Sequence, residues 1–94
     1  MVRRTFEWDE IKRLKNLAKH GLDFEDAAQI YFCPFKVTFA SKLVTESRFL
    51  DLGYGRGEQL LCLVYVIRID CIRIISFRKA SRKERKRYDN HPRF

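Results

Sequence analysis

The chain has 94 residues and a net charge of +8, with 46% apolar residues and thirteen aromatic ones. This length fits one domain, and the apolar content supports a packed core and excludes a chain that is disordered throughout. Its apolar runs are shorter than the roughly 18–20 residues of a membrane helix. The first ten residues, MVRRTFEWDE, lack the apolar segment of a signal peptide. We therefore expect a single domain over residues 1–94 that is cytoplasmic and has no membrane partner.

Cysteine and glycine patterns indicate no cofactor chemistry. Cys33, Cys62 and Cys71 are odd in number, lack C-x₂-C spacing and lie among apolar residues, which favours reduced, buried thiols. The sequence contains no glycine-rich nucleotide motif and no His/Cys cluster with metal-ligand spacing. We expect neither a metal nor a cofactor.

The first third of the chain predicts a short strand followed by two helices. Residues 4–8 have the strand pattern, and Asp9 and Gly21 are a good N-cap and a good left-handed C-cap for a first helix. Asp23 can cap a second helix, so that a helical hairpin spans residues 9–32. Apolar residues recur at helical spacing in both helices: Ile11, Leu14, Leu17 and Ala18 in the first, Phe24, Ala27, Ala28 and Tyr31 in the second.

From residue 35 the apolar period changes to two, which predicts a sheet over residues 35–78. Its third strand, LLCLVYVIRI, is apolar on both faces and is expected to be central. The segment GYGRG at 53–57 is expected to be a hairpin turn. We predict an α+β fold of order β-α-α-β-β-β-β-α, with an antiparallel meander sheet packed against helices on one side. Two strand faces carry arginine beside apolar residues: Arg48 with Leu50, Leu52 and Tyr54, and Arg78 with Ile72, Ile74 and Ser76.

A basic C-terminal helix is predicted over about residues 81–89. Ser81 and Glu84 have the spacing of a capping box. Arg82 lies in the first turn, where a cation opposes the helix dipole but favours a phosphate ligand. From residue 78 onward the chain has eight Lys/Arg and two acidic residues, a net charge of +6, so the first 77 residues carry only +2. This asymmetry indicates a nucleic acid or an acidic protein as partner.

A half-buried arginine requires an anionic partner. For Arg48 and Arg78 that partner is Glu46 or Asp51, or else a substrate phosphate, and the residues alone do not decide between these. His20, at a helix C-terminus, is either a capping residue or a proton-transfer group. RNA cleavage without a metal needs a base for the 2′-hydroxyl, cations at the phosphorus and an acid for the 5′-oxygen, and arginine suits the second task.

Two motifs show a resemblance to a known family. The pattern W-D-x-x-K-x-x-x-N-x-x-K-H-G-x-x-F starts at Trp8, and R-I-I-S-x-R-x-A-S-x-x-E-R starts at Arg73. In this order and at this separation they resemble the BrnT toxins of type II toxin–antitoxin modules, over roughly residues 6–88. The resemblance implies a RelE-like fold and a ribonuclease toxin that arrests growth or translation. It also implies a BrnA-like antitoxin with a ribbon-helix-helix domain, and operator DNA bound only through the toxin–antitoxin complex.

The family pattern falls on Lys19, His20, Arg48, Arg78, Ser81 and Arg85. We expect Arg48 and Arg78 to stabilise the phosphate transition state. His20 or Tyr88 is expected to transfer protons, with helix packing as the alternative role for Tyr88. The expected RNA-binding residues are Lys19, Lys79, Ser81, Arg82 and Arg85. A basic module that binds nucleic acid or an antitoxin without catalysis remains the alternative function.

Overall fold

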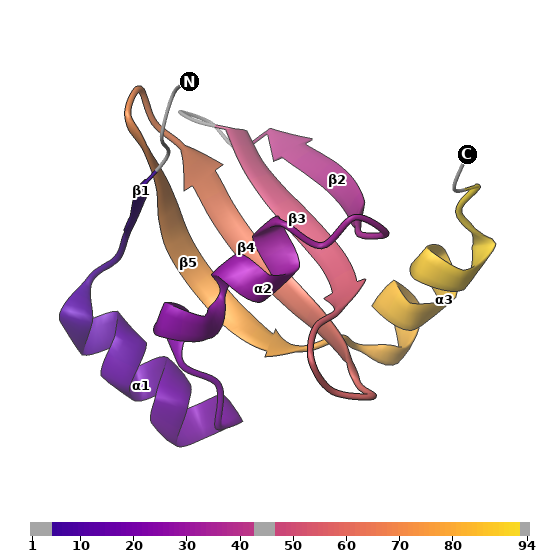
Figure 1. The fold of residues 1–94 in the computed structure, drawn as a ribbon, viewed down its shortest axis with the longest axis horizontal. Helices are drawn as coiled ribbons and strands as arrows, with labels where there is room; N and C mark the ends of the chain where they lie inside the picture. Colours follow the sequence, from indigo (N-terminus) through magenta and orange to yellow (C-terminus); the bar gives the residue numbers. More distant parts are fainter. Residues whose placement is uncertain (1–4, 43–46, 93–94) are drawn as a thin grey trace.

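The computed structural model describes residues 5–42 and 47–92. Its elements are, in chain order, β1 (Thr5–Glu7), α1 (Glu10–His20), the 3₁₀ helix η1 (Phe24–Asp26), α2 (Ala28–Tyr31), β2 (Val37–Lys42), β3 (Ser47–Tyr54), β4 (Leu60–Ile67), β5 (Cys71–Lys79) and α3 (Arg82–Asn90). The strands form one sheet in the order β1-β5-β4-β3-β2 (Figure 1). β2 to β5 are the predicted antiparallel meander, with β4 central, and β1 adds a parallel strand beside β5.

One face of the sheet is covered by η1 and α2, and α1 lies beside the edge of the sheet formed by β5 (Figure 1). Phe24, Ala27 and Ile30 from these helices are buried against the sheet. This face contains the larger core, to which the sheet contributes Leu61, Leu63, Tyr65, Ile72, Ile74 and Phe77. Because side chains alternate along a strand, Leu60 and Cys62 lie on the opposite face.

The opposite face is covered at one end by α3. Tyr88 packs there with Val37, Leu52, Leu60 and Cys62 in a second cluster of buried residues. The prediction that all helices lie on one side is therefore wrong. The reason is that the apolar side of α3 consists of little more than Tyr88, which the sequence does not assign to either face.

A β-bulge changes which side chains of β5 share a face. Val64 pairs with Ser76 and Tyr65 with Ile74, so Ile75 is the extra residue. Ile72 and Ile74 therefore lie on the face covered by η1 and α2, whereas Ser76 and Arg78 lie on the other. The prediction of a single face for these four residues is wrong, because it assumed an uninterrupted period of two.

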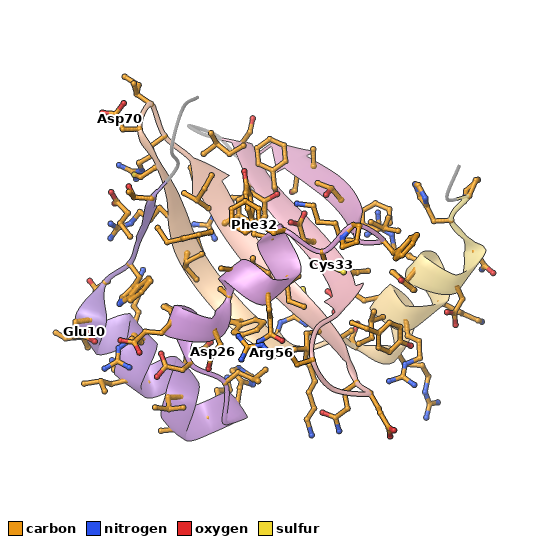
Figure 2. The ribbon with its side chains drawn as sticks, viewed as in Figure 1. Glu10, Asp26, Phe32, Cys33, Arg56 and Asp70 are labelled. Atoms are coloured by element: carbon orange, nitrogen blue, oxygen red, sulfur yellow. The ribbon has the colours of Figure 1, made fainter. Side chains whose placement is uncertain are left out.

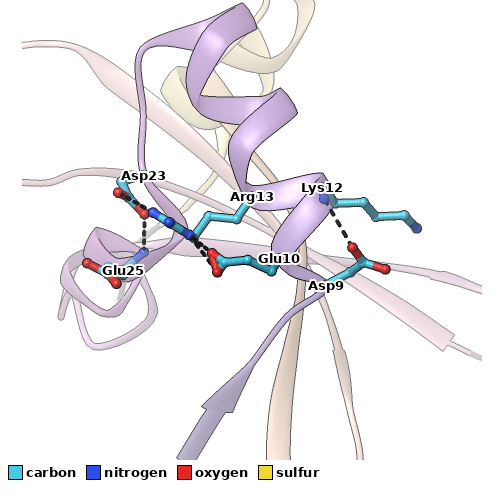
Figure 3. Close-up of polar contacts among 6 residues, drawn as sticks. All are labelled: Asp9, Glu10, Lys12, Arg13, Asp23 and Glu25. Atoms are coloured by element: carbon cyan, nitrogen blue, oxygen red, sulfur yellow. Dashed lines mark hydrogen bonds and ion pairs between the residues drawn. The ribbon is translucent and has the colours of Figure 1, made fainter.

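The helical region follows its predicted caps. The Asp9 side chain accepts a hydrogen bond from the Lys12 N–H (3.1 Å), and Gly21 ends α1 with φ of 70°. Arg13 bridges Glu10 and Asp23 and so ties α1 to the start of η1 (Figure 3). The second helix is not continuous: a 3₁₀ turn precedes the four residues of α2.

The edge of β5 is closed by a side chain of α1. The Asn16 amide donates to the Phe77 carbonyl (2.7 Å) and the Leu22 carbonyl (3.0 Å), and its oxygen accepts from the Phe77 N–H (3.3 Å). β1 pairs only with the first residues of β5, so Asn16 supplies the hydrogen bonds that a neighbouring strand would otherwise make with Phe77.

The predicted hairpin turn between β3 and β4 docks on α2 (Figure 2). The Arg56 N–H donates to Gln29 Oε1 (2.9 Å), and Gln29 Nε2 donates to the Asp26 carbonyl (3.0 Å). A Cβ at Gly55 would displace the end of this Gln29 side chain, and with it the hydrogen bond to Arg56. Gly53, by contrast, lies within β3 rather than in the turn.

All three cysteines are free, with Cys62 buried and Cys33 and Cys71 half-buried. Of the helices in residues 5–42 and 47–92, none has the length and apolar character needed to cross a membrane.

Candidate functional site

The end of β5 and the start of α3 form one hydrogen-bonded unit around Glu84. Arg78 donates from Nη1 to Glu84 Oε1 (2.8 Å) and from Nη2 to Oε2 (2.9 Å). The Ser81 N–H donates to Glu84 Oε1 (2.8 Å), and the Glu84 N–H donates to Ser81 Oγ (3.2 Å), which is the predicted capping box. One carboxylate therefore both caps the helix and holds the guanidinium of Arg78.

The electrostatics of this unit follow from its partial burial. The Arg78 and Glu84 side chains are 30% and 13% exposed. The hydrogen bonds from Arg78, with those from Ser81, lower the pKa of Glu84 to about 2, against the opposing effect of burial. The Cys62 thiol lies 3.8 Å from Glu84 Oε2, and its burial raises its pKa to about 12. Cys62 is therefore a neutral thiol beside an ion pair.

The second arginine of the predicted site, Arg48, lies on the same face of the sheet as Arg78. It is half-buried in β3. Its Nε is buried and has no hydrogen-bond partner among the described residues. A buried donor without a partner is costly.

The sheet register sets the distance between the two arginines. Arg78 pairs with Cys62 and Cys62 with Leu52, so Arg48 lies four residues along and two strands across from Arg78. Those steps amount to about 13 Å and about 10 Å. The guanidinium groups therefore meet on one phosphate only if both side chains extend toward each other over the half-buried Leu50 and Val64.

The internal partner of Arg78 is not one of those predicted. Asp51 lies on the other face, fully buried, where its carboxylate accepts from Lys36 Nζ (2.7 Å), Thr38 Oγ1 (2.6 Å) and Tyr65 Oη (3.0 Å). Glu46 lies outside the described residues. The sequence identifies Glu84 as a helix cap but does not show its contact with Arg78, because that contact depends on the angle between β5 and α3.

Two further predicted site residues, His20 and Lys19, lie in the last turn of α1. They line a hollow of about 310 Å³ at the end of α1, together with Lys12, Lys15, Asn16 and Ile75. Arg48 and Arg78 are not part of this hollow.

Tyr88 has the packing role that the sequence left open. It is buried, its hydroxyl donates to the Phe35 carbonyl (3.2 Å), and its ring contacts Tyr54 edge-on at 5.7 Å. The predicted RNA-binding residues at the end of β5 and the start of α3 are exposed to solvent: Lys79, Ser81, Arg82 and Arg85. Arg87, which the sequence did not single out, lies over the Phe39 ring at 3.7 Å.

Metal ligands are a separate question. In the part of the chain that the structure describes, no three His, Cys, Asp or Glu side chains gather so that they could hold a metal ion. The arrangement offers two guanidinium groups, a kind of group that can bind phosphate through paired N–H donors.

The fold and these residues define a small, basic α+β protein with two half-buried arginines on one sheet face. The family described as "Ribonuclease toxin, BrnT, of type II toxin-antitoxin system" matches residues 8–84, and the chain belongs to this family. The predicted family and the function class of ribonuclease toxin are thereby confirmed.

A solved structure supports the same assignment. The chain is similar to the Brucella abortus ribonuclease toxin BrnT, whose crystal structure was determined at 1.1 Å resolution. The two share 29% sequence identity with a TM-score of 0.68, over 85% of this chain and 100% of that one. The predicted α+β fold is confirmed by this match. No curated protein sequence matches the chain significantly.

Proposed function

We propose that this toxin is a metal-independent endoribonuclease that cuts RNA and thereby arrests growth or translation. The observation that carries the proposal is the pair of half-buried arginines on one sheet face, with the Nε of Arg48 unpartnered among the described residues. Cleavage consists of attack by a ribose 2′-oxygen on the adjacent phosphorus, loss of the 2′-proton and protonation of the departing 5′-oxygen. The extra negative charge on the phosphorus is what arginine stabilises.

In this proposal Arg78 contacts the phosphate and Glu84 is a positioning residue. Glu84 accepts one N–H from each terminal nitrogen of Arg78, and the Lys79 carbonyl accepts another (3.2 Å). The guanidinium has five N–H groups, so two remain for a substrate. Lys79, Ser81, Arg82 and Arg85 surround the same end and are proposed to bind the RNA backbone.

The two candidates for proton transfer, His20 and Tyr88, lie in different surroundings. His20 lies in the hollow with Lys19, and Tyr88 is buried with its hydroxyl bonded to Phe35. We propose His20 as the group to test first, because an imidazole titrates near neutral pH. A His20→Ala toxin with full kcat would remove it from the mechanism.

We further propose that the toxin acts in the cytoplasm and is neutralised by a BrnA-like antitoxin with a ribbon-helix-helix domain. Operator DNA would then be bound only through the complex. The membership of a type II toxin–antitoxin family supports a protein antitoxin. The net charge of +8 is suited to both RNA and an acidic partner.

The test is substitution of Arg78. Arg78→Ala should abolish RNA cleavage and growth arrest while antitoxin binding persists. Arg78→Lys keeps the charge beside Glu84 but loses the planar fork, and should lower kcat/KM by about 100-fold. The matched control is Arg13→Lys, another half-buried, ion-paired arginine, which should change kcat/KM less than threefold. Full activity of Arg78→Ala would exclude this residue from the mechanism.

A non-catalytic binding module is the second candidate, and one observation favours it. The fork of Arg78 is already occupied by Glu84, so Arg78 has a structural role independent of substrate. A purified toxin that shifts RNA mobility but leaves RNA intact would support this module over the ribonuclease.

A further inference from the structure

Helix α1 exposes its apolar side. Ile11, Leu14 and Leu17 are 65%, 52% and 36% exposed, and Ala18 is also exposed. At 100° per residue these four lie on one side of the helix, forming a stripe along its length of about 16 Å. In an amphipathic helix of a monomeric domain this side would face the core.

The core-facing side of α1 is polar instead. Asn16 is buried and bonded to the backbone of Phe77 and Leu22, while Arg13 is paired with Glu10 and Asp23. These contacts fix the rotation of α1 about its axis. They direct the apolar stripe away from the sheet. The exposure of the stripe is therefore set by the orientation of the whole helix and not by the rotamers of single side chains.

A row of lysines borders the stripe. Lys12, Lys15 and Lys19 are all exposed and, at the same angular step, occupy the sector between the apolar stripe and Asn16. The surface of α1 is therefore an apolar strip with cations along one side. Exposed apolar surface rimmed by charge is typical of protein interaction sites.

We propose that the α1 stripe, defined as Ile11, Leu14, Leu17 and Ala18 with the rim Lys12, Lys15 and Lys19, is the docking surface for an acidic amphipathic helix of the antitoxin. This rests on the proposed function, in which the toxin is neutralised by a protein. A helix packs its apolar face along such a stripe, and its acidic residues would meet the lysine rim.

Charge disfavours the other occupants. A second copy docked on its own stripe in antiparallel, two-fold symmetry would place lysine rim beside lysine rim, in a chain that already carries +8. An RNA backbone would match the lysines but would leave the aliphatic strip uncovered. An acidic protein helix complements both parts of the surface.

The test uses the full toxin and the proposed BrnA-like antitoxin. Ile11→Gln/Leu14→Gln removes exposed apolar surface and retains good helix formers. It should raise the Kd for the antitoxin at least tenfold, and cells producing both proteins should no longer be protected. The cleavage rate of the free toxin should stay within twofold of wild type, which shows that the variant is folded.

The matched control is Ile67→Gln/Ile69→Gln, the same kind of change at two exposed isoleucines, one at the end of β4 and one in the turn that follows it. It should leave the Kd within twofold. Lys12→Gln/Lys15→Gln should slow association several-fold at low salt, and the difference should vanish at high salt.

The outcomes separate the docking surface from the proposed function. Wild-type toxin that binds the antitoxin, with an unchanged Kd for Ile11→Gln/Leu14→Gln, would overturn the docking surface alone. If that variant instead abolished a dimer of the free toxin seen by light scattering, with antitoxin binding unchanged, the occupant would be a second copy and the proposal would be wrong. Failure of wild-type toxin to bind the antitoxin at all would overturn the neutralisation part of the proposed function.

Discussion

Glu84 decides how the basic C-terminal segment is organised. Its carboxylate accepts from Arg78 and from the Ser81 N–H at once, so strand, cap and helix are held by one side chain. The predicted phosphate site at the start of α3 thus already contains an internal anion. A substrate phosphate would bind beside Glu84 on the remaining N–H groups of Arg78.

We predict that Glu84→Gln destabilises the fold by about 1.5 kcal/mol at pH 7, the scale of a hydrogen bond to a charged group. Glutamine can still complete the capping box, so the loss reports the charge beside Arg78. Urea unfolding measures it. Glu58→Gln, at an exposed position in the β3–β4 turn, is the control and should change the free energy of unfolding by less than 0.5 kcal/mol. Equal stabilities of the two variants would show that the pair contributes nothing.

The same pair predicts a pH dependence. The pKa of Glu84 falls from 4.5 to about 2 on folding, so the folded state favours the ionised carboxylate. Its stabilisation is complete above about pH 5 and is lost as the pH falls toward 2. The difference in free energy of unfolding between wild type and Glu84→Gln should therefore shrink steadily over this range. A difference that stays constant down to pH 2.5 would contradict the assignment.

Asp51 is the buried acidic residue of the sheet face that η1 and α2 cover. It has three side-chain partners, Lys36, Thr38 and Tyr65, and burial together with Asp51 raises the pKa of Tyr65. We predict that Asp51→Asn costs about 3 kcal/mol, because Lys36 loses its counter-charge in a half-buried position. Adding Lys36→Met should recover part of the loss in urea unfolding. A double variant less stable than Asp51→Asn would show that Lys36 does not depend on Asp51.

At the scale of elements, the contact between α1 and β5 depends on one amide. Asn16 satisfies both backbone groups of Phe77, beyond the end of β1. In the sequence, Asn16 is a polar residue within an amphipathic helix, and such a residue usually lies at an exposed position. Its burial was not predictable, because no periodic pattern shows that a helix closes the edge of a sheet.

We predict that Asn16→Ala costs about 2–3 kcal/mol, since it leaves buried N–H and carbonyl groups of Phe77 without partners. Hydrogen exchange of the Phe77 amide should accelerate more than that of amides in β4. Lys15→Ala, next to it but exposed, should change the free energy of unfolding by less than 0.5 kcal/mol. Slow, unchanged exchange at Phe77 would mean that another group protects this edge.

At the scale of the whole molecule, charge is concentrated at the end that carries α3. Arg82 and Arg85 are exposed there, and each contact with an RNA phosphate contributes about 0.7 to the slope of log K against log salt. We predict that Arg82→Gln/Arg85→Gln, measured with a cleavage-inactive Arg78→Ala toxin, lowers that slope by about 1.4. The control is Arg68→Gln, an exposed cation in the turn between β4 and β5, which should leave the slope for RNA unaltered. An unaltered slope for the first pair would place the RNA elsewhere.

The sequence by itself determined the features that depend on local order: both caps of α1, the capping box of α3, the central place of β4, the antiparallel meander and the toxin family. Each of these follows from periodicity, from residues within about four positions of each other or from two ordered motifs. Only the tertiary structure decided which face of the sheet α3 covers, and that a bulge at Ile75 places Arg78 and Ile74 on different faces. It also decided that Glu84 is the partner of Arg78 and that α1 turns its apolar side outward. Those outcomes depend on the packing of segments that are distant in the chain. There, one inserted residue changes the face on which the following side chains of a strand lie, and one buried amide sets which side of a helix faces the sheet.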